Sequence, residues 1–116
     1  MEDYGILTVR TTTASGAYPV EGVSVSIHGT QGVGADTEIS VLTSRDGVTQ
    51  PLLLPAPARA LSLSPESTEE PFSRYDIELY KEGYYRKKLF DVAVFSGITS
   101  ILPVNMIPST AYDTVQ

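Results

Sequence analysis

His28 is the one side chain of this sequence whose unperturbed charge changes near neutral pH, so any Ser-His-Asp relay would have to use it. Period-two alternation places His28 beside Ser24 and Ser26 on one face of a β-strand, and the opposite face is apolar. That apolar set is Val23, Val25 and Ile27. A strand histidine is far more often structural than catalytic, so we expect no catalytic residue. A small hydrolase that uses His28 or loop carboxylates stays open as the alternative.

Carboxylates and metal ligands give no stronger signal. Glu66, Glu69 and Glu70 lie in a segment rich in Pro and Ser and are typical of solvated charge. Asp46 precedes Gly47, which indicates a turn. With no cysteine and one histidine, a zinc site would lack its usual ligands. No Asp-x-Asp-x-Asp loop is present, although an all-oxygen calcium site stays open. We therefore predict no metal and no cofactor.

A hairpin over 74–95 gathers aromatic and basic residues. With the three-residue loop Lys81-Glu82-Gly83, Tyr80 would face Tyr84, and Glu78 would face Arg86. Asp76 would face Lys88 in the same register. The predicted binding patch contains four residues, Tyr80, Tyr84, Arg86 and Lys88.

Flat aromatic faces in this patch suit sugar rings or partner side chains, and arginine adds a planar donor fork for carboxylates. The patch could therefore bind an acidic or glycan-bearing partner such as a cell-wall polymer. In the alternative interpretation, Glu78 and Asp76 only neutralise Arg86 and Lys88, and the tyrosines only stabilise the hairpin.

The residues considered above must be positioned by short segments in which apolar and polar residues alternate. Gly, Pro or Asp-Gly separates these segments. Apart from the 74–95 hairpin, strands are expected at 6–12, 20–28, 38–44, 48–54 and 98–107. Asp46-Gly47 predicts a hairpin between two of them, and a change in apolar parity predicts a bulge near Phe90 or Asp91. Pro51 and Pro103 indicate edge strands. The fold class predicted is all-β, an antiparallel seven-stranded Greek-key β-sandwich.

The length of 116 residues fits one domain, residues 1–116, with 41% hydrophobic residues for its core. We expect the core of the fold to span 5–107. Residues 55–73 form a Pro-rich insertion, and 108–116 form a C-terminal tail.

A net charge of −6 disfavours binding to nucleic acid, since a negatively charged protein surface repels the phosphate backbone. No segment has the roughly 18 apolar residues of a membrane span, and the first residues do not resemble a signal peptide. We expect a domain that acts in the cytoplasm or is delivered to the envelope as part of a larger system. The strand at 6–12 lacks proline, so we predict it to be the edge through which a homo-oligomer could form.

Four motifs in order resemble one known module: Gly-Ile-Leu-Thr-Val from Gly5, Tyr-Pro-Val-Glu-Gly-Val-Ser-Val-Ser-Ile from Tyr18, Thr-Ser-Arg-Asp-Gly-Val-Thr from Thr43, and Tyr-Asp-Ile-Glu-Leu-Tyr-Lys-Glu-Gly-Tyr from Tyr75. This order is similar to the carboxypeptidase regulatory-like, or transthyretin-like (prealbumin-like), β-sandwich domain. The insertion at 55–73 departs from the family pattern. The Leu-Pro-Ala-Pro and Pro-Val-Asn-Met-Ile-Pro stretches also resemble modules that accompany bacterial cell-wall or spore-cortex lytic proteins.

The resemblance implies a prealbumin-like sandwich with a non-catalytic role, stabilising, spacing or binding beside another domain. The enzymatic branch of the family, a urate-pathway hydrolase, uses several histidines and a C-terminal Tyr-Arg-Gly-Ser signature. This chain has one histidine and ends Ala-Tyr-Asp-Thr-Val-Gln. The expected function is therefore an accessory module whose partner is a protein or a cell-wall polymer.

Overall fold

The computed structural model describes residues 2–57 and 72–109. Most of the predicted insertion at 55–73, most of the tail at 108–116, and the carboxylates Glu66, Glu69 and Glu70 lie outside the described residues. Residues 55–57 belong to a strand. No helix in the described part of the chain is long and apolar enough to cross a bilayer.

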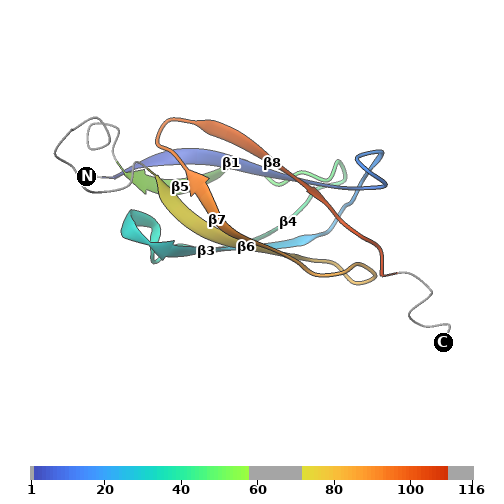
Figure 1. Ribbon diagram of the computed structural model, residues 1–116. Coiled ribbons are helices and arrows are strands. Elements are labelled where there is room, and N and C mark those ends of the chain that lie inside the picture. Colours follow the sequence, from blue (N-terminus) through green and yellow to red (C-terminus); the bar gives the residue numbers. More distant parts are fainter. Residues whose placement is uncertain (1, 58–71, 110–116) are drawn as a thin grey trace.

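Two sheets pack face to face as an all-β sandwich, which confirms the predicted fold class (Figure 1). The described strands number eight. The first sheet contains β1 (Glu2–Thr13), β2 (Tyr18–Pro19), β5 (Leu52–Pro57) and β8 (Thr99–Asn105). The second sheet contains β3 (Ser24–Gln31), β4 (Glu38–Leu42), β6 (Ser73–Tyr80) and β7 (Lys87–Val94), in the order β4-β3-β6-β7. The helical element among the described residues is a single 3-10 turn, η1 (Gly32–Gly34).

Strand β1 lies in the middle of the first sheet. It pairs antiparallel with β5 and β2 along one side and parallel with β8 along the other, from Ile6↔Thr99 to Thr12↔Asn105. The prediction that 6–12 is an edge strand is therefore wrong, because the end of the chain returns to cover its second side. The β1–β8 pair is also the parallel pair in a sandwich that is otherwise antiparallel.

The Asp46-Gly47 prediction is half right. A tight turn is present, since the Gly47 N–H donates to the Ser44 carbonyl and Gly47 has a φ of 80°. The hairpin is absent, because β4 pairs with β3 in the second sheet and β5 pairs with β1 in the first. The chain thus changes sheets here and changes again before β6. As a result β6 lies beside β3, a Greek-key type of connection.

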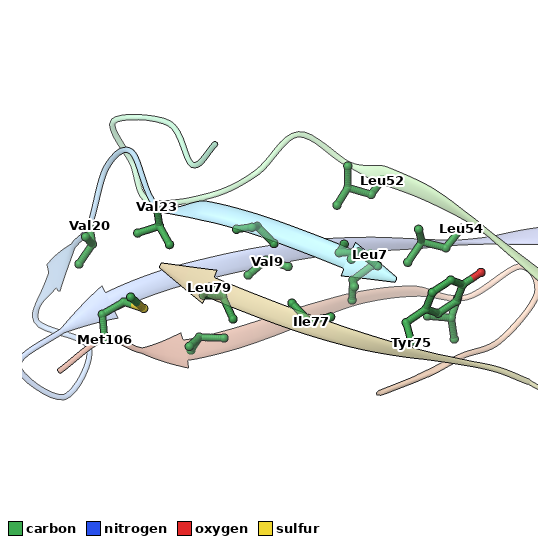
Figure 2. Close-up of a cluster of buried hydrophobic side chains, with 14 of the residues drawn as sticks. Leu7, Val9, Val20, Val23, Leu52, Leu54, Tyr75, Ile77, Leu79 and Met106 are labelled. Atoms are coloured by element: carbon green, nitrogen blue, oxygen red, sulfur yellow. The ribbon is translucent and has the colours of Figure 1, made fainter. Parts of the chain in front are cut away.

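Alternation in the sequence accounts for the core. Inward-facing residues of β1, β3 and β6 are buried, while their neighbours in the chain are half-buried or exposed, and β5 follows the same pattern up to Ala56. Figure 2 shows these side chains between the two sheets, with Tyr75 at one end of the core and Met106 toward the other. The Tyr75 hydroxyl donates to the Pro55 carbonyl at 2.5 Å. This bond satisfies the one polar atom of a large buried side chain.

Three buried threonines support the chain where it changes sheets, and the sequence analysis did not single them out. The Thr43 hydroxyl donates to the Val20 carbonyl and accepts from the Val23 N–H, both at 2.9 Å. The Thr49 hydroxyl accepts from the Val9 N–H at 3.0 Å, and the Thr11 hydroxyl lies near the Val20 and Gly47 carbonyls. These hydroxyls replace ladder hydrogen bonds at places where strand pairing stops.

Among the described edge strands, β5, β4 and β8 each carry a feature that hinders pairing with another chain. Pro55 and Pro57 lie in edge strand β5, and β4 is only five residues long. In β8, the bonds Ile6 N–H to Ile98 carbonyl and Met106 N–H to Thr12 carbonyl direct the even-numbered residues toward β1. The missing donor of Pro103 therefore lies on the open side. The predicted edge role of Pro103 is confirmed.

Gly29 in β3 and Gly34 between β3 and β4 pack closely against neighbouring atoms. A Cβ on Gly29 would lie 1.6 Å from the Gly34 carbonyl oxygen, and a Cβ on Gly34 would lie 2.2 Å from the Tyr75 hydroxyl oxygen. Both positions thus need glycine for close approach. The glycines shape a tight connection against the end of the core.

Candidate functional site

The β6–β7 hairpin has a different register from the predicted one. Glu78 lies opposite Lys88 and Leu79 opposite Lys87, a shift of two residues from the three-residue-loop register. Gly83 does have a positive φ of 93°, as predicted. The predicted bulge is confirmed. The register shifts between Tyr75 and Ile77 of β6, and the opposite segment of β7 contains Phe90 and Asp91.

Long-range backbone contacts explain the shift. Tyr84 forms an isolated bridge with Pro108, and the Tyr85 N–H donates to the Ile107 carbonyl at 2.9 Å. The tip of the hairpin is thus drawn to the end of the chain. Tyr84 packs against the core instead of facing Tyr80. The prediction that Tyr80 and Tyr84 pair across the hairpin is therefore wrong, and Tyr84 does not join the other three predicted residues.

Tyr80, Arg86 and Glu78 form a compact cluster on the outer face of the second sheet. The Arg86 guanidinium carbon lies 4.7 Å from the centroid of the Tyr80 ring. The same guanidinium contacts the Glu78 carboxylate. The predicted Glu78–Arg86 pair thus exists despite the shifted register, because the long arginine side chain spans the difference. Arg86 thus stacks on the Tyr80 ring, and the Glu78 carboxylate balances its charge.

Other cations near the hairpin tip also have local acceptors. Lys81 donates to the Glu21 carbonyl, and Lys87 donates to the Asn105 carbonyl at 3.0 Å. The Lys87 contact joins β7 to β8 across the open side of the sandwich. Lys88 lies on the outer face opposite Glu78. The basic residues that the sequence places together are therefore mostly engaged in holding the fold.

A shallow depression of about 170 Å³ lies beside this cluster on the same sheet face. Its polar and aromatic lining comes from three neighbouring strands: His28 on β3, Asp76 and Glu78 on β6, and Lys88 and Phe90 on β7. Of these, the sequence analysis placed only Lys88 in a binding patch. Alternation indicates that each residue faces outward, but only the register of the strands brings them together.

His28 contacts a carboxylate. Its Nδ1 lies 3.2 Å from Glu38 Oε2, across the β3–β4 pair in which the two residues are opposite each other. Both side chains are substantially exposed to solvent. Among the described residues, no group of three or more His, Cys, Asp or Glu side chains could hold a metal ion. The structure thus places His28 on the outer face, as alternation predicts.

The pKa of Glu78 gives a test of the Tyr80–Arg86–Glu78 cluster. The hydrogen bond from Arg86 lowers the pKa of this carboxyl below its ordinary value; desolvation opposes the shift, and the charges of Arg86, Lys88 and His28 reinforce it. We expect Arg86→Gln to raise the Glu78 pKa, measured by NMR titration of the side-chain carboxyl. Arg10→Gln, on the first sheet, should leave it unchanged. A Glu78 pKa that does not respond to Arg86→Gln would contradict the contact.

The sign of the linked stability follows from this direction. Because the folded-state pKa lies below the unfolded one, the contribution of Glu78 is present above the unfolded pKa and is lost as pH falls through the folded pKa. The stability difference between the wild type and Arg86→Gln should therefore shrink at acid pH to the part that comes from the Arg86–Tyr80 stack.

The outer face of the first sheet has a different character. Its exposed large side chains include the apolar or aromatic Tyr4, Leu53 and Ile101, and the charged Arg10 is exposed further along β1. The outer face of the second sheet carries several ion pairs and the depression. The two faces of the sandwich are therefore chemically distinct.

Comparison with known proteins shows the fold and no family. No family model matches the sequence, and no curated protein matches it. Among solved structures, the chain is similar to the Bacillus anthracis TIE protein, with a TM-score of 0.58 and 17% identity over 91% of this chain and 17% of that one.

It is also similar to 3-chlorocatechol 1,2-dioxygenase from Rhodococcus opacus 1CP, with a TM-score of 0.58 and 12% identity over 91% of this chain and 60% of that one. Chlorocatechol 1,2-dioxygenase from Pseudomonas putida gives a TM-score of 0.54 at 9% identity, over 92% and 60% of the two chains. The chain thus spans 17% to 60% of the length of these proteins. At such identities, what they share with it is a two-sheet β-sandwich.

Proposed function

We propose that this chain is a non-enzymatic accessory module that binds a protein or cell-wall polymer beside a partner domain in a bacterial envelope system. Support comes from its resemblance to carboxypeptidase regulatory-like, or transthyretin-like, domains, whose role is of this kind. The motifs that carry the resemblance coincide with the entry into β3 after Gly22, the Asp46-Gly47 turn, and Gly83 in the hairpin loop.

The observation that carries the proposal is the outer face of the β4-β3-β6-β7 sheet. Tyr80 is 41% exposed there, and the Arg86 guanidinium lies over its ring. A half-exposed aromatic ring with an arginine above it and a depression beside it offers apolar contact and directed donors within one small area. Surfaces of this composition favour recognition of a polar partner that also has a flat apolar side.

Comparison with longer chains supports the idea of a module. A sandwich of this fold makes up 17% of the B. anthracis TIE protein and 60% of each dioxygenase. The same architecture therefore occurs as one part of a larger protein, which is the context in which an accessory module acts.

Co-sedimentation with purified bacterial cell-wall material tests the proposal. We expect the wild type to pellet with the wall, and Tyr80→Ala/Arg86→Ala to remain in the supernatant, because the variant loses the stacked pair. Tyr84 is left unchanged, since it packs on the core. The matched control is Tyr4→Ala/Arg10→Ala, which removes the same two residue types from the outer face of the first sheet and should pellet like the wild type. A wild type that never pellets, or a Tyr80/Arg86 variant that still does, would refute the proposal.

The hydrolase alternative is distinguished by His28→Ala. His28 is exposed and its Nδ1 lies 3.2 Å from Glu38 Oε2, so its removal should leave the fold intact. Loss of a measurable hydrolytic rate in a folded His28→Ala protein would instead favour the alternative.

A further inference from the structure

The bulge in β7 shapes the depression on the second sheet. Asp91 has a φ of 57°, a left-handed conformation that is uncommon for a residue other than glycine. Its N–H donates to Asp76 Oδ1 at 3.1 Å, which holds the bulge against β6. Bulges of this kind redirect side chains, and here Phe90 and Asp91 are both exposed. The bulge therefore gives the Phe90 ring a position that it would not have in a regular strand.

Phe90 is the most exposed aromatic side chain of this face, at 67%. It lines the depression together with Asp76 and Lys88. An exposed phenyl ring is less favourable in water than in contact with another apolar surface. A ligand with a flat apolar side would recover part of this cost by stacking on the ring.

The charges around the depression are largely paired. Three ion pairs surround it: His28–Glu38, Arg74–Asp91 and Glu78–Arg86. One carboxylate oxygen of Asp76 accepts from the bulge. Among residues 2–57 and 72–109, the other oxygen has no donor and the Lys88 ammonium has no hydrogen-bond acceptor. One acceptor and one donor thus remain for a ligand. A polyanion gains little here, because Asp76 would repel it as strongly as Lys88 attracts it.

The size of the depression limits the ligand. Pockets for drug-sized ligands span about 300–1,000 Å³. At about 170 Å³ and open on one side, this depression accommodates a single ring.

We propose that the depression at the β7 bulge binds one neutral sugar ring. The apolar side of the ring stacks on Phe90, one hydroxyl donates to Asp76, and another accepts from Lys88. This inference rests on the proposed function, since it names the ligand class of the same sheet face. Of the ligands suggested by the sequence, an acidic one is not favoured here, because Asp76 would repel it.

NMR titration of the intact ¹⁵N-labelled chain with N-acetylglucosamine trimer tests the inference, and poly-glutamate serves as the anionic probe. We expect the trimer to shift the amide signals of Asp76, Lys88 and Phe90, and poly-glutamate to leave them unchanged. Phe90→Ala should weaken trimer binding at least tenfold, Phe90→Tyr should retain it, and Asp76→Asn should weaken it while preserving the acceptor for the bulge. Tyr4→Ala, an exposed aromatic on the other sheet, should bind like the wild type.

Several outcomes would overturn the inference. These are the absence of trimer binding, binding of poly-glutamate at the same amides, or trimer binding that survives Phe90→Ala. A thermal melt of each variant distinguishes a lost contact from a lost fold, and Phe90→Tyr keeps the test valid if Phe90→Ala unfolds. If the trimer fails while the wild type still pellets with cell walls, the sugar site is wrong and the accessory role stands. If pelleting also fails, both are wrong.

Discussion

Tyr75→Ala should lower the free energy of unfolding by about 3–5 kcal/mol, the largest effect expected of a single substitution in this domain. Tyr75 is fully buried at one end of the core (Figure 2), so its removal leaves a cavity and an unsatisfied Pro55 carbonyl. Tyr75→Phe removes only the hydroxyl and should cost about 1–2 kcal/mol. Urea unfolding followed by circular dichroism measures both values.

The matched control for this experiment is Tyr4→Ala. Tyr4 is the same residue type on the exposed face of β1, where a substitution should change stability by about 0.5 kcal/mol or less. If Tyr75→Ala and Tyr4→Ala had equal effects, the packing shown in Figure 2 would be wrong.

Thr43→Val should cost about 1–3 kcal/mol although the two side chains have nearly the same shape. The substitution leaves the buried Val23 N–H without the hydroxyl that accepts from it. The Val20 carbonyl keeps a partner, because the Thr11 hydroxyl also donates to it, so the cost comes chiefly from one donor.

Thr99→Val is the control for Thr43→Val. Thr99 is exposed on β8, and a β-branched replacement there should be neutral within about 0.5 kcal/mol. A neutral Thr43→Val would show that the hydroxyl does not support the point at which the chain enters β3.

Much of the fold could be predicted from local patterns. Alternation alone identified Val23, Val25 and Ile27 as the inward residues at β3, because a strand between core and solvent must alternate. The parity change at Phe90 and Asp91 located the bulge for the same reason. The Asp46-Gly47 signal identified a turn but not the destinations of the two strands, since turn chemistry describes four residues and sheet assignment depends on the entire core.

The register of β6 and β7 shows where local rules stop. Opposite charges and aromatic neighbours favour the three-residue loop, yet Tyr84 and Tyr85 instead contact residues 107 and 108. Those contacts lie more than twenty residues away in the sequence. The same limit applies to β1, whose second side is covered by β8, a strand distant in the sequence.

The candidate site could be predicted only in part. Tyr80, Arg86 and Lys88 share a face because of alternation, and long side chains let Arg86 reach Glu78 despite the shifted register. Phe90 and His28 were not grouped with them. Their association requires β3 to lie beside β6, and β6 beside β7, with the bulge opposite Asp76.

The most direct test of the binding role maps where soluble fragments of bacterial cell wall contact the ¹⁵N-labelled chain. The account predicts amide shifts confined to the outer face of the second sheet, at residues 76–80 and 86–91, with the amides of β1 and β8 unchanged. Shifts confined to β1 and β8, or no shifts at saturating fragment concentrations, would contradict it.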